Sequence, residues 1–188
     1  MAGILRLAVS GSAGSFSEEA ARWYLQREGQ EGEIVFGIDP DGVFAALAEG
    51  RADLGIIPVV NSRGGLVIDA YVAMGKNLFT VVDHVVIEVQ QCLLALPGTT
   101  KAAITQFASH PQAFAQCERY LLNNFPNIKH TPWSDTAEAA EDLKSGKLPL
   151  TTGVIASALA GKNNGLEILE KGIQDARPNL TTFLVVQQ

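Results

Sequence analysis

The sequence has little cysteine, no excess of basic charge and no long hydrophobic run. Its two cysteines, Cys92 and Cys117, show no CxxC spacing, and both fall in apolar patterns. Two buried thiols are typical of a reducing compartment, so we expect a cytoplasmic protein without disulfides. The net charge of −6 argues against a nucleic-acid partner, which needs clustered Lys and Arg. No stretch approaches the roughly 20 apolar residues of a membrane helix, so we expect no membrane partner.

Metal-ligand spacing and Gly-rich phosphate-binding motifs are also missing. The three histidines, His84, His110 and His130, lie far apart, and we interpret His110 as structural. We therefore expect neither a metal nor a cofactor. What remains is ordinary globular material, with 47% of residues hydrophobic and 18% charged. That composition supplies ample core for one large domain or two small lobes.

Short apolar runs alternate with helical patterns from the start of the chain. Strands are predicted near residues 5–10, 33–38 and 53–60, with amphipathic helices between them. This alternation argues for an α/β fold with a parallel, layered sheet. A second α/β pattern begins at Ala103. The strand-rich run 79–96 is too long for one ordinary strand, which indicates that the chain crosses there from one lobe to another.

We expect one functional domain over residues 1–188, built from two α/β lobes. The first lobe takes about residues 1–80 and 178–188, and the second takes about residues 98–170. The crossings between them lie near residues 80–97 and 170–180. Clefts between lobes are common ligand sites, so a cleft is expected here.

The stretch 53–65 is the first candidate for a site. Its apolar half predicts a buried strand, and Pro58, which has no backbone donor, is expected near the carboxyl end of that strand. The polar residues Asn61–Arg63 follow, and then Gly64-Gly65 allows a sharp turn. Polar loops past the carboxyl ends of strands bind ligands in open α/β sheets. Such residues also make plain surface turns, so both interpretations stay open.

Five short motifs, in order along nearly the whole chain, resemble the catalytic domain of prephenate dehydratases. They are Gly14-Ser-Phe-Ser-Glu-Glu-Ala-Ala21, Ala52-Asp53 through Asn61-Ser62 to Gly65, Ser109-His-Pro-Gln-Ala113 with Gln116-Cys117, Ser134-Asp-Thr-Ala-Glu-Ala-Ala140, and Ile173-Gln-Asp175 with Asn179-Leu-Thr-Thr-Phe183. The resemblance implies a two-lobed fold of the type 2 periplasmic-binding-protein kind. It also implies a homodimer.

The resemblance further implies a lyase of phenylalanine biosynthesis. Prephenate would lose its ring carboxylate as carbon dioxide and its ring hydroxyl as water, giving phenylpyruvate. The site must then bind two carboxylates and supply a proton to the departing hydroxyl. The family's threonine that is linked to the leaving hydroxyl corresponds to Thr181. Substrate-binding roles are expected at the other motif positions, which are Ser15, Asn61, Ser62, Gln112, Ser134, Thr182 and Phe183.

Two motif positions depart from the family pattern. Val60 stands where the family has glutamate, and Thr182 stands where it has arginine, so one carboxylate and one cation are replaced. Prephenate is a dianion, and a water-excluded site must neutralise it. Arg63 is the nearest candidate for a replacement cation, because it follows Asn61 and Ser62 in the polar loop. A solvated loop arginine is the alternative interpretation.

Three functions stay open on this scaffold. The first is a prephenate dehydratase, the second is a prephenate decarboxylase that leaves the ring non-aromatic, and the third is a non-catalytic binder of an aromatic amino acid or keto acid. Prephenate and arogenate are both open as substrates. The sequence ends at Gln188 without the ACT domain that follows in many relatives, so we expect no phenylalanine feedback within this chain.

Overall fold

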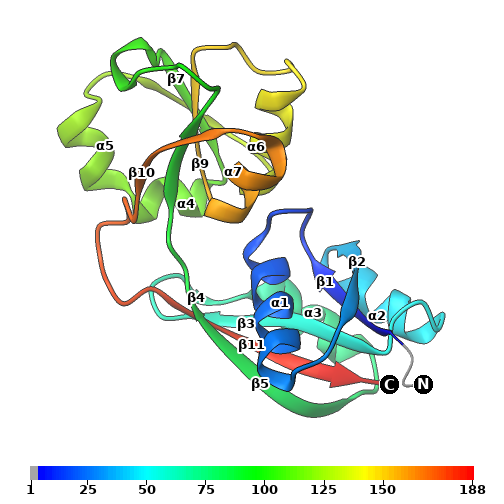
Figure 1. Ribbon diagram of the computed structural model, residues 1–188. Coiled ribbons are helices and arrows are strands. Elements are labelled where there is room, and N and C mark those ends of the chain that lie inside the picture. Colours follow the sequence, from blue (N-terminus) through cyan, green and yellow to red (C-terminus); the bar gives the residue numbers. More distant parts are fainter. Residues whose placement is uncertain (1–3) are drawn as a thin grey trace. The chain divides into compact units, whose positions relative to one another are not determined.

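The chain forms two compact units, each built on its own sheet (Figure 1). The computed structural model describes residues 4–188. The first unit contains Phe16–Glu88 and Asn179–Gln188 together with the chain up to Ser12, and the second contains Ala13–Ser15 and Val89–Pro178. The passage between Glu88 and Val89 lies inside the long run 79–96. Within the described residues, no helix has the length and apolar character needed to span a membrane.

The first unit holds a mixed sheet of strand order β2-β1-β3-β11-β5, with the short β4 paired to β3. Its elements are β1 (Leu5–Ser10), α1 (Phe16–Glu28), β2 (Gly32–Ile38), α2 (Pro40–Ala48), β3 (Leu54–Asn61), β4 (Gly65–Leu66), α3 (Ile68–Lys76), β5 (Thr80–Glu88) and β11 (Leu180–Gln187). The strand β1 is parallel to β2 and β3, whereas β11 is antiparallel to β3 and β5. The predicted parallel sheet is therefore only half right, because the last strand of the chain inserts beside β3 in the opposite direction.

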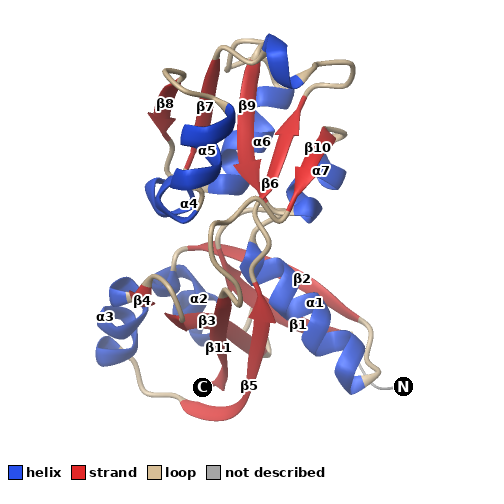
Figure 2. Ribbon diagram, turned by 90° about the vertical axis from the view of Figure 1, so that its left-hand side faces the viewer, coloured by secondary structure: helices blue, strands red, loops and turns tan. Residues whose placement is uncertain are grey.

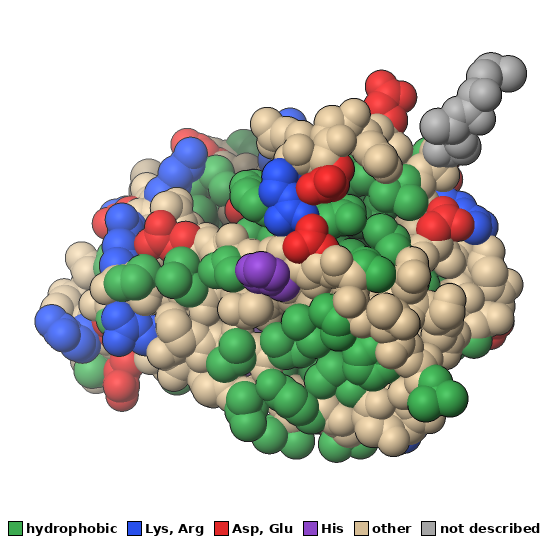
Figure 3. Space-filling model, turned by 90° about the horizontal axis from the view of Figure 1, so that it is seen from below, with side chains coloured by type: hydrophobic (Ala, Val, Ile, Leu, Met, Phe, Trp, Pro, Cys, Tyr) green, Lys and Arg blue, Asp and Glu red, His purple; other side chains and the backbone are tan. Residues whose placement is uncertain are grey.

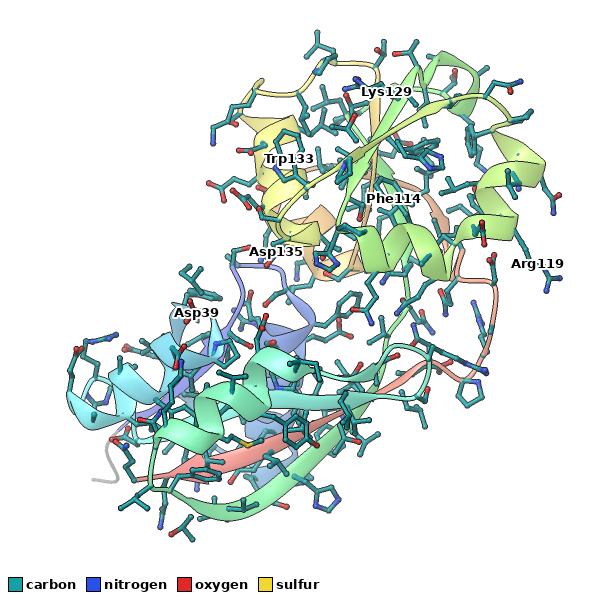
Figure 4. The ribbon with its side chains drawn as sticks, turned by 180° about the vertical axis from the view of Figure 1, so that it is seen from behind. Asp39, Phe114, Arg119, Lys129, Trp133 and Asp135 are labelled. Carbon is teal, nitrogen blue, oxygen red and sulfur yellow. The ribbon has the colours of Figure 1, made fainter. Side chains whose placement is uncertain are left out.

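Helices cover both faces of this sheet. Buried side chains of α1, such as Ala21 and Tyr24, belong to one core with Ile56 and Phe183. The helices α2 and α3 line a second core on the other face, together with Ile57 and Val186. Figure 1 shows α1 in front of the sheet, and Figure 4 shows α2 and α3 from behind. Both faces of β3 are thereby covered, as its apolar run predicts.

Pro58 lies within β3 and not at its end. Thr182 of β11 stands opposite Val60, and the next residue, Phe183, stands opposite Pro58, so Val59 has no partner in β11. This irregularity is a β-bulge, one of the few sheet positions that tolerates proline, because proline cannot donate to the ladder. The strand therefore continues beyond Pro58, and Asn61 is its last residue.

The strand β5 forms one edge of the sheet and exposes Val81, Val82 and Val86. Figure 3 shows hydrophobic side chains gathered on the side of the molecule seen from below. Arg27 of α1 ion-pairs with Asp83 and donates to the His84 carbonyl oxygen at 3.2 Å. A charged side chain on an edge strand hinders pairing with strands of other molecules, so Asp83, which Arg27 holds in place, protects this edge.

The second unit holds a sheet of strand order β10-β6-β9-β7-β8, and Figure 2 shows the five strands side by side. Its elements are β6 (Cys92–Ala95), the 3-10 helix Lys101–Ala103, β7 (Gln106–Ser109), α4 (Pro111–Gln116), α5 (Glu118–Asn124), β8 (Lys129–Pro132), α6 (Thr136–Lys144), β9 (Thr152–Ala156), α7 (Ala158–Asn164) and β10 (Glu167–Lys171). Leu143 of α6 and Leu121 of α5 lie in separate cores, each shared with residues of β9. The same two cores contain Cys92 and Cys117 as buried thiols. Burial raises the pKa of the Cys117 thiol to about 12, so it stays protonated at neutral pH.

The apolar residues Ala113, Phe114, Cys117 and Leu121 have the spacing of one helical face, but the chain forms two helices, α4 and α5, with a break at Cys117. The Asp175 carboxylate accepts hydrogen bonds from the backbone N–H groups of Arg119 at 2.8 Å and Tyr120 at 3.0 Å. These are donors at the start of α5, which an uninterrupted helix would have satisfied internally. A partner far away in the sequence therefore sets this helix start.

Candidate functional site

The side-chain amide of Asn61 joins two segments that lie far apart in the sequence. Its Nδ2 donates to Asn179 Oδ1 and to Thr181 Oγ1, both at 2.8 Å. Its Oδ1 accepts from the backbone N–H groups of Arg63 at 2.8 Å and Gly64 at 2.7 Å. An asparagine amide offers two donor hydrogens and two acceptor lone pairs, so all four are in use.

These four bonds fix the orientation of the Asn61 amide. A rotation by 180° would turn the amide nitrogen toward two N–H donors and the amide oxygen toward the Asn179 Oδ1 acceptor. Each misdirected pair would leave polar groups unsatisfied in a site where the Asn61 side chain is only 7% exposed. The Nδ2 atom is therefore held toward Thr181 as a donor.

The hydroxyl of Thr181 consequently acts as an acceptor toward Asn61. Thr181 stands opposite Asn61 in the β3–β11 ladder, so both side chains point to the same face of the sheet. Among the described residues, no hydrogen bond takes up the hydroxyl hydrogen of Thr181. A hydroxyl can accept and donate at once, which leaves its hydrogen available for a ligand. Thr181 is 7% exposed, so little solvent reaches this donor.

A reciprocal pair of bonds ties the next residue of the loop to the same strand. Ser62 N–H donates to the Leu180 carbonyl oxygen at 2.8 Å, and Leu180 N–H donates to Ser62 Oγ at 2.9 Å. Ser62 therefore stabilises the start of β11. Asn179, which accepts from Asn61, is 1% exposed, and motif reasoning did not assign it a role. Its place in the Asn179-Leu-Thr-Thr-Phe183 motif was the signal that could have found it.

The other predicted residues of the first unit lie in three different settings. Arg63 is exposed, and its backbone N–H is held by Asn61. Phe183 is 1% exposed and packs in the core beneath α1, where it supports the sheet. Thr182 is half-buried and lies between Thr181 and Phe183, so the alternation of a strand directs its side chain to the opposite face. The site on the Thr181 face is thus formed by Asn61, Thr181 and the loop after β3.

A family model described as prephenate dehydratase matches residues 7–188. The chain belongs to the prephenate dehydratase family. It is 39% identical over 185 residues to the arogenate dehydratase/prephenate dehydratase 6, chloroplastic, of Arabidopsis thaliana. That match covers 97% of this chain and 43% of the relative, so the chain spans less than half the length of this curated relative.

Solved structures share the fold of this prephenate dehydratase family member. A prephenate dehydratase in complex with L-Phe from Arthrobacter aurescens gives a TM-score of 0.88 at 24% identity, covering 98% of this chain and 60% of that one. GqqA, described as a novel type of quorum quenching acylase, gives a TM-score of 0.84 at 30% identity, covering 97% and 64%. Periplasmic-binding-protein-like domains also occur among the structural neighbours. The predicted α/β fold class is confirmed.

The first family motif begins with Gly14 and Ser15, which belong to the second unit. Ser15 is 7% exposed and follows Gly14, whose carbonyl oxygen accepts from Ser157 Oγ at 2.6 Å. A Cβ atom at Gly14 would lie 2.6 Å from the Cα atom of Ala160, so this close approach requires glycine. Ser157 also accepts from Ala160 N–H at 2.9 Å and thereby caps α7. Gly14 is thus held against α7 by Ser157, a serine that sequence reasoning missed.

Gln112 and Ser134 are both exposed in the second unit. Gln112 is the second residue of α4, and its N–H donates to His110 Nδ1 at 3.2 Å, so His110 caps this helix as a structural residue. Ser134 Oγ bonds Glu138, while Asp135 accepts from Ala137 N–H at 2.6 Å and is the N-cap of α6. Figure 4 shows Asp135 at the start of that helix. Asp135, and not the motif residue Ser134, therefore caps α6. Over residues 4–188, no three His, Cys, Asp or Glu side chains form a metal-binding group.

We predict that Asn61→Ala lowers the free energy of unfolding by about 1–3 kcal/mol, because it removes the acceptor of the Arg63 and Gly64 N–H groups and the donor to Asn179 Oδ1 and Thr181 Oγ1. Asn61→Asp keeps the oxygen that accepts from Arg63 and Gly64, and should cost about 1 kcal/mol less than Asn61→Ala. Urea unfolding measures both.

Asn77→Ala is the matched control for Asn61→Ala, because Asn77 Nδ2 makes one bond, to the Ala73 carbonyl oxygen at 2.9 Å, in the same unit. It should cost less than about 1 kcal/mol. Equal losses for Asn61→Ala and Asn77→Ala would contradict the role of Asn61 as a four-bond junction.

Proposed function

We propose that residues 7–188 form a dehydratase domain that removes water and carbon dioxide from prephenate or arogenate. The observation that supports this most directly is the Thr181 hydroxyl, which accepts from Asn61 at 2.8 Å and keeps its own hydrogen for a ligand. Membership of the prephenate dehydratase family supplies the reaction class. Prephenate and arogenate share the ring whose bonds break, and they differ in a keto or an amino group on the side chain.

The chemistry demands little beyond one well-placed donor. The bond between the ring and its carboxylate breaks, and its electron pair forms a new ring double bond as carbon dioxide leaves. The ring carbon–oxygen bond breaks at the same time, and the departing oxygen takes a proton and leaves as water. Aromatisation drives both steps. A hydrogen bond to the departing oxygen becomes stronger as negative charge develops on that oxygen. It therefore stabilises the transition state more than the bound substrate, and it raises kcat.

Thr181 is the donor in this proposal. The proton passes from its hydroxyl to the departing oxygen, and solvent later returns a proton to Thr181. Asn61 is a positioning residue, since its Nδ2 occupies a lone pair of the Thr181 oxygen and directs the hydroxyl hydrogen away from the protein. Low exposure of both side chains reduces competition from water for this hydrogen.

Arg63 supplies the positive charge that a dianionic substrate needs. Its backbone N–H donates to Oδ1 of Asn61, whose Nδ2 bonds Thr181, so one side chain links the backbone of Arg63 to the Thr181 hydroxyl. Its side chain extends from an exposed position. A guanidinium can grip a carboxylate with two parallel hydrogen bonds, which an ammonium cannot reproduce.

We predict that purified protein converts prephenate to phenylpyruvate, or arogenate to phenylalanine, and that Thr181→Val lowers kcat about 100- to 1,000-fold. Valine has the shape of threonine without the donor. Thr181→Ser retains a hydroxyl and should keep kcat within about tenfold of the wild type. Product formation followed by absorbance and by chromatography measures all three proteins with both substrates.

The products of the same assay separate the alternatives. A non-aromatic keto acid would indicate a decarboxylase, and intact prephenate despite saturable binding would indicate a binding protein. Either outcome would overturn the proposed dehydratase. Full activity of Thr181→Val would show that the protein is a dehydratase in which Thr181 is not the proton donor.

We predict that Arg63→Ala raises KM about 10- to 100-fold, because a charged hydrogen bond to a carboxylate contributes about 1.5–3 kcal/mol. Arg63→Lys should recover only part of that loss. Arg51→Ala is the control, since Arg51 is an exposed arginine of the first unit that pairs with Glu49, and its KM should match the wild type. Unchanged KM and kcat in Arg63→Ala would show that the substrate anion is met elsewhere.

A further inference from the structure

The two positions where this chain departs from the family motifs stand opposite one another. Val60 of β3 pairs with Thr182 of β11. Thr182 also pairs with Val86 of β5, and Val60 pairs with Leu66 of β4. A row of four side chains therefore runs across four strands, from Leu66 through Val60 and Thr182 to Val86. None of the four carries a charge.

This row lies on the sheet face that is opposite to the Thr181 hydroxyl. Asn61 and Thr181 are directly bonded and share one face, and Phe183 lies on that face in the core under α1. Alternation along β11 then places Thr182 on the other face, with its partner Val60. A side chain at position 182 is thus adjacent in sequence to Thr181 but separated from its hydroxyl by the sheet.

Opposed residues in a strand pair have Cβ atoms about 4.5–5.5 Å apart, so their side chains contact each other. A glutamate at position 60 and an arginine at position 182 would form an ion pair whose charges cancel. Valine and threonine at the same positions also sum to zero charge. Exchanging one pair for the other therefore leaves the charge of this end of the sheet unchanged.

We propose that Val60 and Thr182 form one neutral cross-strand pair that positions β11 at Thr181, and that Thr182 does not contact the substrate. The pair directly precedes the Asn61–Thr181 pair in the ladder and directly follows the bulge at Val59, so it fixes the register between them. The kinetic part of this inference rests on the proposed function. Both residues are positioning residues.

A double-mutant cycle tests the pair. Val60→Glu alone and Thr182→Arg alone each place an unpartnered charge at a half-buried position of a neutral row, so each should raise the unfolding equilibrium constant. The combined variant should recover about two- to fivefold in that constant relative to the product of the single effects. Each single variant should lower kcat about fivefold with KM within twofold of the wild type, and the combined variant should restore kcat.

Val60→Glu combined with Val86→Arg is the matched control. It uses the same row, but the new arginine lies one strand further from residue 60. We expect its effects on unfolding to be additive within the error of the measurement. Urea unfolding measures the coupling between the two substitutions without any substrate. The unfolding result therefore stands even if the protein proves not to be a dehydratase.

Two results would overturn the inference. One is additive unfolding effects of Val60→Glu and Thr182→Arg. The other is a fall in KM of tenfold or more in Thr182→Arg alone, which would mean that position 182 faces the substrate and lacks its cation. If Val60→Glu does not fold, Thr182→Val tests whether the Thr182 hydroxyl contacts the substrate, because this variant keeps the β-branched shape and removes only the hydroxyl. Its KM and kcat should stay within twofold of the wild type, and a tenfold rise in KM would contradict the proposal.

Discussion

Four hydrogen bonds to one side-chain amide hold the proposed site together. Asn61 ends a strand of the early chain, and two of its partners, Asn179 and Thr181, lie 118 and 120 residues further on. The other two partners are the N–H groups of the loop that carries Arg63. One amide therefore fixes the orientation of a hydroxyl donor and the path of a loop that carries a cation. Saturation of all four of its positions leaves the amide a single orientation.

The sheet makes this junction rigid. The last strand enters between β3 and β5 and runs antiparallel to both, so Thr181 is held from two sides by backbone ladders. Phe183 and Val185 anchor the strand in the core beneath α1. Sites built on strands are more exact than sites built on loops, because packing locks their rotamers. The bulge at Val59 accommodates Pro58 and brings Asn61 into register with Thr181.

Local patterns in the sequence predicted much of this molecule. Apolar periodicity located the strands and most helices, and the motif order indicated the family. Asn61, Ser62 and Thr181 were all marked by motifs, and the structure joins them through the β3–β11 end. The boundaries that failed depend on distant partners. The strand passes Pro58 because of a bulge against β11, and the helix breaks at Cys117 where Asp175 captures its N–H groups.

The sequence does not show which residues pair across strands, and this explains why Thr182 was expected to bind the substrate. Adjacency in sequence placed Thr182 beside the donor, Thr181. Adjacency in the ladder places it beside Val60, on the other face of the sheet. Period-two alternation along β11 was visible in the sequence, but the partner across the ladder was not, because register depends on a strand about 120 residues away.

The central claim is that Asn61 acts through the Thr181 hydroxyl, and a cycle of Asn61→Asp and Thr181→Val measured in kcat tests it most directly. An aspartate would accept the Thr181 hydrogen and withdraw it from the substrate, so Asn61→Asp alone should lower kcat about 100-fold. With Thr181→Val already in place there is no hydrogen to withdraw, and adding Asn61→Asp should change kcat by less than about threefold. If the fold decreases in kcat of Asn61→Asp and Thr181→Val multiply in the combined variant, the account is contradicted, because Asn61 would then act on the reaction independently of Thr181.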